Sequence, residues 1–141
     1  MDKGKYIIIN GPNLNLIGIR EVEIYGTVSF SSLIEEIKEE YSSSSVEYFQ
    51  SNSEGSIIDK LHETGFDYDG IVLNPGAYTH TSIAIADAVK AISCPVVEVH
   101  LSNIYKREPF RHVSYIQPHC VKSIVGKGME GYRLALEHLM G

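Results

Sequence analysis

Short apolar runs rich in β-branched residues recur along the chain. Five of them stand out, at residues 6–9, 46–49, 70–73, 95–99 and 121–125. Runs that stay apolar at successive positions, without alternating polar residues, suit strands that are covered on both faces, as in a parallel sheet. The pattern therefore predicts five buried strands.

The segments between these runs carry apolar residues at helical spacing. Leu33, Ile34 and Ile37 form one apolar face, and Ser32 with Glu35 has the spacing of a capping box in front of it. Further helices are expected around Ile57, Ile58 and Leu61, closed by Gly65, and over residues 83–92 and 129–140. Strands that alternate with helices predict an α/β three-layer sandwich with a parallel sheet and right-handed crossovers. Five strands favour a flavodoxin-like fold with strand order 2-1-3-4-5.

Length, charge and cysteine content narrow the class of protein. The chain has 141 residues, the size of one domain, and a net charge of −6 from 12 basic and 18 acidic residues. An acidic domain lacks the positive field that attracts phosphate backbones, so no nucleic-acid partner is expected. No apolar run approaches the ~18 residues of a membrane helix. Cys94 and Cys120 form no paired motif, which favours a reduced, cytoplasmic protein.

Polar side chains gather where the first, third and fourth predicted strands end. In an open α/β sheet, ligands bind beyond the carboxyl ends of the strands, near the switch in strand order. These three strands are neighbours in the proposed order, and the polar residues beyond them include few carboxylates. The predicted rim is therefore basic within an acidic protein, which suits a small anionic molecule. The residues in question are Asn13, Arg20 and Tyr25, then Asn74 and His80, then His100, Ser102, Arg107 and Arg111.

Two carboxylates stand in apolar surroundings. Glu98 interrupts the fourth strand and lies two residues before His100, so both side chains face the same side of that strand. A buried carboxylate needs a partner, and a histidine with such a partner at a strand end is a good catalytic candidate. Asp87 lies among alanine and isoleucine residues, and a partner, structural or ligand, is expected for it as well.

Structural roles remain open for several of these residues. Asn13 could simply hold a turn, and His80 could cap the helix that follows it. Tyr25 could be a half-buried ring, and Arg20 a solvated charge. The connection over residues 10–29 is nevertheless long for a βα loop, which indicates a lid or binding loop.

Three tempting motifs do not lead to a function. The stretch at residues 126–131 matches GxGxxG, but the chain ends ten residues later, with no second strand and no acidic residue ~20 positions on. Dinucleotide binding is therefore not expected. His80, Asp87, Glu98 and His100 match no zinc signature, and their neighbours disfavour a cation, so no metal is expected. No GxSxG or Cys–His arrangement indicates acyl transfer.

Seven short segments, spread over nearly the whole chain, form one pattern of order and spacing. They are residues 11–16 (GPNLNL), 20–21 with 24–26 (RE, IYG), 50–55 (QSNSEG), 74–82 (NPGAYTHTS), 98–103 (EVHLSN), 107–108 with 110–112 (RE, FRH) and 126–132 (GKGMEGY). In this order and spacing they resemble the type II 3-dehydroquinate dehydratases, or type II dehydroquinases. The resemblance implies a single catalytic domain over residues 1–141 that converts 3-dehydroquinate to 3-dehydroshikimate in the shikimate pathway. It also implies a flavodoxin-like fold, no cofactor or metal, and a dodecamer of four trimers.

The resemblance also implies roles for individual residues. Tyr25 would be the general base, Arg20 would favour its phenolate, and His100 would be the general acid. Asn13 would help to hold a water against the enolate, and Glu98 would support His100. The implied substrate-binding residues are Asn74, His80, Leu101, Ser102 and Arg111, with Arg107 in the same basic cluster and Asp87 near the trimer contact.

The chemistry of these residue types agrees with such a reaction. A tyrosine with a pKa near 10 is a poor base at pH 7, and a nearby arginine, which stays charged, favours the phenolate. Residues 19–27, flanked by Gly18 and Gly26, would form a mobile lid that carries the base. Two alternatives remain: a non-catalytic flavodoxin-like module for an anionic ligand, and an imine mechanism through a lysine such as Lys106. A binding module has little use for a tyrosine beside the arginine.

Overall fold

The five predicted strands form one parallel sheet in the computed structural model, which describes residues 4–17 and 29–141. The strands lie in the order β2-β1-β3-β4-β5, and every neighbouring pair is parallel. This confirms the predicted fold class and strand order. The bounds are β1 Lys5–Asn10, β2 Ser45–Gln50, β3 Gly70–Asn74, β4 Val96–His100 and β5 Lys122–Val125.

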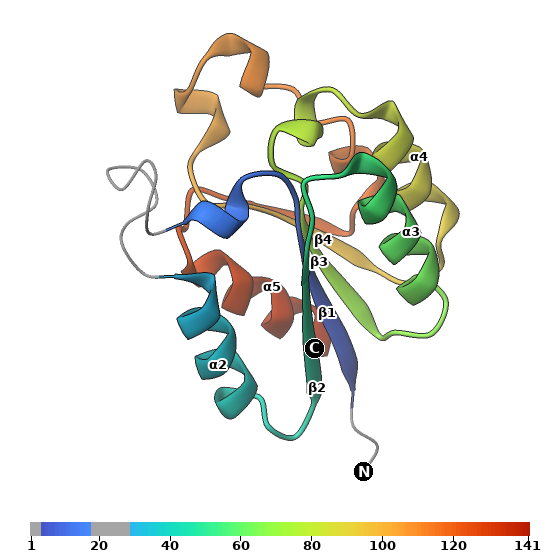
Figure 1. Ribbon diagram of the computed structural model, residues 1–141, viewed down its shortest axis with the longest axis vertical. Helices are drawn as coiled ribbons and strands as arrows, with labels where there is room; N and C mark the ends of the chain where they lie inside the picture. Colours follow the sequence, from blue (N-terminus) through green and yellow to red (C-terminus); the bar gives the residue numbers. More distant parts are fainter. Residues whose placement is uncertain (1–3, 18–28) are drawn as a thin grey trace.

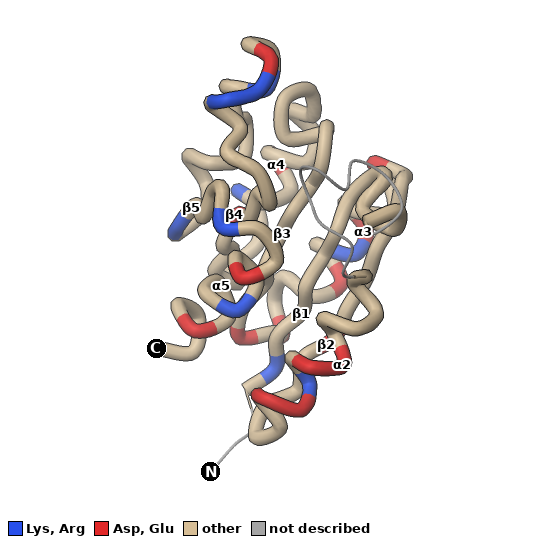
Figure 2. The backbone as a smooth tube through the Cα atoms, turned by 90° about the vertical axis from the view of Figure 1, so that its left-hand side faces the viewer, with Lys and Arg blue, Asp and Glu red and all other residues tan. Residues whose placement is uncertain are grey.

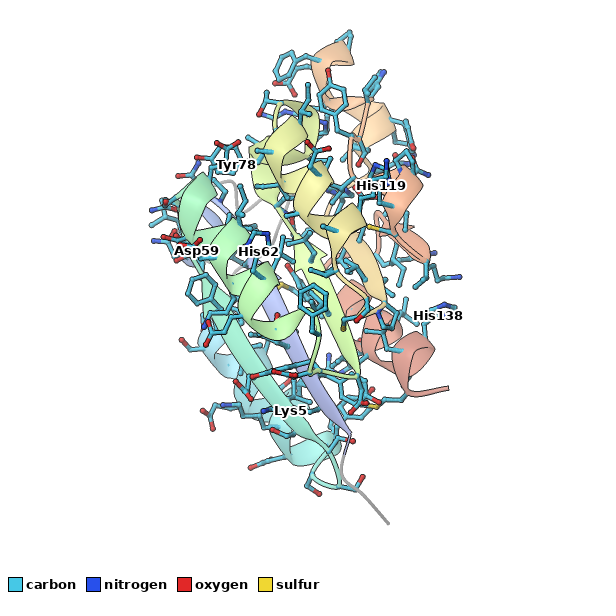
Figure 3. The ribbon with its side chains drawn as sticks, turned by 90° about the vertical axis from the view of Figure 1, so that its right-hand side faces the viewer. Lys5, Asp59, His62, Tyr78, His119 and His138 are labelled. Carbon is cyan, nitrogen blue, oxygen red and sulfur yellow. The ribbon has the colours of Figure 1, made fainter. Side chains whose placement is uncertain are left out.

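Within the part of the chain that the structure describes, four α-helices cover the two faces of the sheet (Figure 1). Helices α2 and α5 pack on one face, and α3 and α4 lie side by side on the other, as Figure 3 shows. Their bounds are α2 Phe30–Glu40, α3 Glu54–Thr64, α4 Ile83–Ala91 and α5 Glu130–Met140. The predicted three-layer sandwich is therefore present.

The apolar runs are continuous because both faces of each central strand are buried. In β1, Ile8 belongs to the core beneath α2 and α5, whereas Ile7 and Ile9 belong to the core beneath α3 and α4. Successive side chains of a strand point to opposite faces, so a strand covered on both sides needs apolar residues throughout. The same alternation places Asn10 on the α5 side of the sheet.

The start of α2 differs from the prediction. The helix begins at Phe30, and the side chain of Ser29 accepts the backbone N–H of Ser32 at 3.3 Å, so Ser29 and not Ser32 is the N-cap. The predicted capping box of Ser32 and Glu35 is wrong. Phe30 is buried at 5% exposure against the core, and this contact extends the helix one turn beyond its predicted start.

The connection from β4 to β5 contains no α-helix, unlike the other crossovers. It consists of three short 3-10 turns, η3 Ile104–Lys106, η4 Pro109–Arg111 and η5 Gln117–His119. Pro109 is the first residue of η4, and the extended backbone of Glu108 before it separates η4 from η3. This connection projects beyond the carboxyl ends of the strands, at the top of Figure 1.

Charge is unevenly distributed over the fold. Acidic positions concentrate on α2, whereas basic positions occur on the projecting connection at the opposite end (Figure 2). Arg133 of α5 joins the two helices of one face through ion pairs with Glu40 at 2.8 Å and Glu36 at 2.9 Å. None of the helices among the described residues is long and apolar enough to cross a membrane.

Candidate active site

A cavity lies beyond the carboxyl ends of β1, β3 and β4, where the strand-order rule places a ligand. Its wall includes eight of the residues predicted from the sequence. These are Asn13, Asn74, His80, His100, Leu101, Ser102, Arg107 and Arg111. Five lining residues were not singled out: Pro12, Leu14, Gly76, Ala77 and Ile104. These residues are apolar or, like Gly76, lack a side chain, so their position at the cavity wall is seen only in the folded structure.

Close backbone contact joins the loops after β1 and β3. The N–H of Gly11 donates to the carbonyl of Asn74 at 2.7 Å, and a Cβ at Gly11 would lie 2.4 Å from the carbonyl oxygen of Pro75. Gly76 has a φ of +61°, in the left-handed region that favours glycine. Glycine at these two positions lets both loops approach the cavity together.

Asn13 is held in place from the end of β2. Its backbone is left-handed, with a φ of 68°, and its N–H donates to Oδ1 of Asn52 at 3.0 Å. Nε2 of Gln50 donates to the same Oδ1 and to the carbonyl of Gly11, each at 3.1 Å. Asn13 thus does hold a turn, and that turn also borders the cavity. The segment at residues 50–55 was recognised from its sequence, but this positioning contact was not.

Glu98 and His100 form the buried pair predicted from their spacing. Oε2 of Glu98 lies 2.8 Å from Nε2 of His100, and the two residues are 1% and 5% exposed. Two serines outside the predicted set complete the surroundings: Ser123 donates to Oε1 at 2.7 Å, and Ser114 donates to Oε2. Ser123 is the register partner of Glu98 on β5, so only strand pairing brings it there.

The surroundings of Glu98 favour the carboxylate. Burial tends to raise the pKa of Glu98, but hydrogen bonds from His100, Ser114 and Ser123 outweigh it and hold the pKa below its ordinary value. An ionised carboxylate can only accept, so Nε2 of His100 carries the hydrogen, and Nδ1 is the ring nitrogen left for the cavity. A carboxylate in this position orients the imidazole and stabilises positive charge on it.

Replacing Glu98 by glutamine is expected to destabilise the protein by about 3–5 kcal/mol at pH 7, because an amide N–H₂ would then face hydrogen-bond donors in a buried site. Because the folded pKa is lowered, the contribution of Glu98 is full above its unfolded pKa of about 4.3 and is lost as pH falls through the folded value. Urea unfolding of the wild-type protein and the variant at pH 7 and pH 3 measures the loss of stability and its dependence on pH. If the free energies of unfolding of the two proteins differ by the same amount at pH 7 and at pH 3, Glu98 is not an ionised carboxylate in the folded protein.

His80 lies beside His100 and is not a helix cap. The two ring centroids are 6.4 Å apart, and Nδ1 of His80 lies 2.7 Å from the carbonyl of Val113. Ser82 caps α4 instead, since its side chain accepts the N–H of Ile85 at 2.9 Å. Burial lowers the pKa of His80, which favours the neutral ring. A carbonyl can only accept, so Nδ1 carries the hydrogen and Nε2 is an acceptor.

The basic side of the cavity comes from the connection after β4. Arg111 donates through Nε to Oε1 of Glu108 at 3.2 Å, and Arg107 lies 3.8 Å from the same oxygen. His112 contacts the carbonyl of Arg107 at 3.0 Å and so ties the two turns together. Glu108 is half exposed, so the two guanidinium groups retain positive charge at the cavity wall.

The glycine-rich stretch at residues 126–131 supports the site through its backbone. Gly126, at a φ of +74°, donates its N–H to the carbonyl of His100 at 3.1 Å. Gly128, at a φ of +57°, donates to the carbonyl of Leu101 at 2.9 Å. The stretch therefore fixes the backbone of two cavity residues.

Of the predicted site residues that the structure describes, Glu98 and Asp87 do not line the cavity, and Glu98 contacts His100, which does. Asp87 is exposed on α4. His80 belongs to η2 (Gly76–His80), and residues 81 and 82 separate it from α4, which carries Asp87. Arg20 and Tyr25, with the predicted lid at residues 19–27, lie outside the described residues.

The cavity has no lysine among its described lining residues, and Lys106 is exposed outside it. An imine mechanism thus finds no amine at this part of the wall. Over residues 4–17 and 29–141, no group of three or more His, Cys, Asp or Glu side chains could hold a metal ion. The wall instead offers amide, hydroxyl and guanidinium groups as hydrogen-bond donors for an anionic ligand, with the imidazoles of His80 and His100 beside them.

The parallel α/β fold, the basic cavity at its carboxyl edge and the buried Glu98–His100 pair define an enzyme of the general acid–base class that takes a small anionic substrate. Comparison with known proteins identifies the family. The family model described as "Dehydroquinase class II" matches residues 4–140, and the chain belongs to this family.

Relatives and solved structures agree with this assignment. A 3-dehydroquinate dehydratase of Clostridium perfringens is 56% identical over 138 residues, which are 96% of each chain. One of Bacillus cereus is 52% identical, over 96% of this chain and 94% of the relative. The crystal structure of the type II dehydroquinase from Butyrivibrio crossotus matches with a TM-score of 0.95 and 48% identity, over 99% of both chains.

Proposed function

We propose that the chain catalyses the dehydration of 3-dehydroquinate to 3-dehydroshikimate and water, as a class II dehydroquinase of the shikimate pathway. One observation carries the assignment of the site: the His100–Glu98 pair lies at a cavity that eight of the predicted residues line, within a chain that belongs to this family. The proposal treats residues 1–141 as a single catalytic domain in the cytoplasm, with no cofactor.

The proposed reaction is an elimination by general acid–base catalysis. The phenolate of Tyr25, favoured by Arg20, takes the proton next to the ketone, and the electron pair forms an enolate. Re-formation of the ketone expels the hydroxyl group from the neighbouring carbon as a carbon–carbon double bond forms. His100, as the imidazolium whose Nε2–H bonds to Glu98, gives this hydroxyl the proton of Nδ1, and the hydroxyl leaves as water. Each proton transfer of this kind typically contributes 10²–10⁴-fold.

The proposed substrate contacts follow from the cavity wall. Asn13 lines the cavity, and its amide would hold a water against the enolate oxygen, since hydrogen-bond donors in a water-poor pocket stabilise such a charge. Ser102 and the backbone near Ile104 are proposed for the substrate carboxylate. Asn74, His80, Leu101 and Arg111 would contact the ring and its hydroxyl groups, and Arg107 adds positive charge.

An absorbance assay for the conjugated enone product tests the proposed function. Purified protein with 3-dehydroquinate should produce the enone, and dialysis against a chelator should leave the rate unchanged. Borohydride added with substrate should leave no adduct on any lysine. A protein that binds 3-dehydroquinate but forms no enone would be the alternative, a non-catalytic module. Loss of activity on chelation that a divalent ion restores would contradict the cofactor-free mechanism.

We also propose that the chain assembles as a homo-oligomer, a dodecamer of four trimers, with Asp87 at or near a trimer contact. Asp87 is exposed, and Ile83, one turn earlier on the same helix, is 64% exposed. An exposed apolar residue beside a charge suits a contact between copies. Replacing Asp87 by alanine is expected to weaken assembly and raise KM, while Asp59→Ala, at an exposed position of α3, should change neither. Sedimentation that shows a fully active monomer at assay concentration would contradict this prediction.

A further inference from the structure

A series of hydrogen-bonded polar side chains runs beneath the cavity, and Asn74 is its only member with a role in the proposed mechanism. Asn10 and Asn74 are register partners at the carboxyl ends of β1 and β3, and they are 0% and 3% exposed. Both point to the α5 side of the sheet, because Ile8 and Val72, two residues earlier on each strand, lie in the core beneath α2 and α5. Tyr132 of α5 is fully buried and bonds to both amides.

The hydrogen bonds of this series all run in one direction. The backbone N–H of Gly76 donates to Oδ1 of Asn74 at 3.1 Å, which makes that oxygen an acceptor. Nδ2 of Asn74 then donates to the hydroxyl oxygen of Tyr132 at 3.0 Å, and this hydroxyl donates to Oδ1 of Asn10 at 2.8 Å. Nδ2 of Asn10 donates to the hydroxyl oxygen of Tyr48 at 3.2 Å.

This order determines which way the amide of Asn74 faces. If the amide were rotated by 180°, its N–H₂ would meet the N–H of Gly76, and two donors would face each other in a buried site. The hydroxyl of Tyr132 has its own hydrogen committed to Asn10, so toward Asn74 it can only accept. Asn74 also lines the cavity, and its Nδ2 carries two hydrogens, of which Tyr132 takes one.

We infer that Tyr132 is a positioning residue for substrate binding, which holds the Asn74 amide so that its second N–H points to a substrate oxygen. The inference rests on the proposed function, because it requires that Asn74 bind 3-dehydroquinate. Its chemical content is specific: Asn74 recognises an acceptor, a hydroxyl or carboxylate oxygen, and not a donor. Tyr132, which is 58 residues away from Asn74 in sequence, orients the Asn74 amide without touching the ligand.

Replacing Tyr132 by phenylalanine removes the hydroxyl and keeps the ring. Without that oxygen, the Asn74 amide loses the acceptor that orients it, and Asn10 loses a donor. We expect KM for 3-dehydroquinate to rise about tenfold, the equivalent of one lost hydrogen bond, with a smaller change in kcat. Tyr41→Phe is the matched control, because it removes a hydroxyl bonded to Glu137 at 3.0 Å on the surface between α2 and α5. It should leave KM and kcat unchanged.

A double-mutant cycle separates positioning from mere core stability. In an Asn74→Ala background, Tyr132→Phe should change KM less than twofold, since the amide it positions is gone. If Tyr132→Phe raises KM equally in both backgrounds, or lowers only the melting temperature, the inference is wrong. If that variant does not fold, Asn10→Ala, which removes the acceptor of the Tyr132 hydroxyl, should raise KM in the same way, and an unchanged KM would overturn the inference. An inactive wild-type protein would instead contradict the proposed function.

Discussion

The Tyr25→Phe variant is expected to lower kcat at least 10²-fold, with the fold and KM close to unchanged. Phenylalanine keeps the ring but has no oxygen to take a proton, and general-base catalysis typically contributes 10²–10⁴-fold. Tyr25 lies outside the described residues, so its role rests on the family pattern and on the chemistry of a phenol beside Arg20. Steady-state kinetics with 3-dehydroquinate measure the effect.

In the described part of the cavity, His80 is the alternative to Tyr25 as the general base. His80 has a lowered pKa, its Nδ1 hydrogen faces Val113, and its Nε2 is therefore a free acceptor in a neutral ring. A Tyr25→Phe variant that retains more than a tenth of wild-type kcat, together with a His80→Ala variant that loses it, would transfer the role to His80. Tyr68→Phe, which removes a hydroxyl bonded to Glu47 at 2.8 Å, is the matched control.

His100→Ala is expected to lower kcat by 10²–10⁴-fold because the departing hydroxyl loses its acid. The variant should nevertheless still remove the proton next to the ketone, since Tyr25 performs that earlier step. In D₂O, it should therefore exchange this hydrogen of 3-dehydroquinate for deuterium, while the enone forms only slowly. Proton NMR follows the exchange, and absorbance follows the product.

The two variants should differ in this experiment. Tyr25→Phe is expected to lose both exchange and elimination, and His100→Ala only elimination. A His100→Ala protein that loses exchange as well, with its fold intact, would show that His100 acts before the leaving group departs. Ser123→Ala, which removes only a support of Glu98, should give a much smaller loss of kcat, because two hydrogen bonds to the carboxylate remain.

The sequence by itself determined the sheet and its order. Continuous apolar runs are needed wherever a strand is covered on both faces, and this signal is local, so the five strands were predicted within a residue or two. The start of α2 was predicted less well. Buried Phe30 lengthens the helix through a tertiary contact that the local pattern does not show.

The sequence also determined the Glu98–His100 pair, because two residues on one strand face meet whatever the rest of the fold does. The partners that come from other elements were decided only by the tertiary structure. Ser123 reaches Glu98 through the register of β4 and β5, and Tyr132 reaches Asn74 because α5 packs over β3 and β4. Such contacts join residues tens of positions apart, and periodicity carries no information about them. Asn13 shows both cases: its type marks a turn, but only the packing of three loops makes that turn part of the cavity.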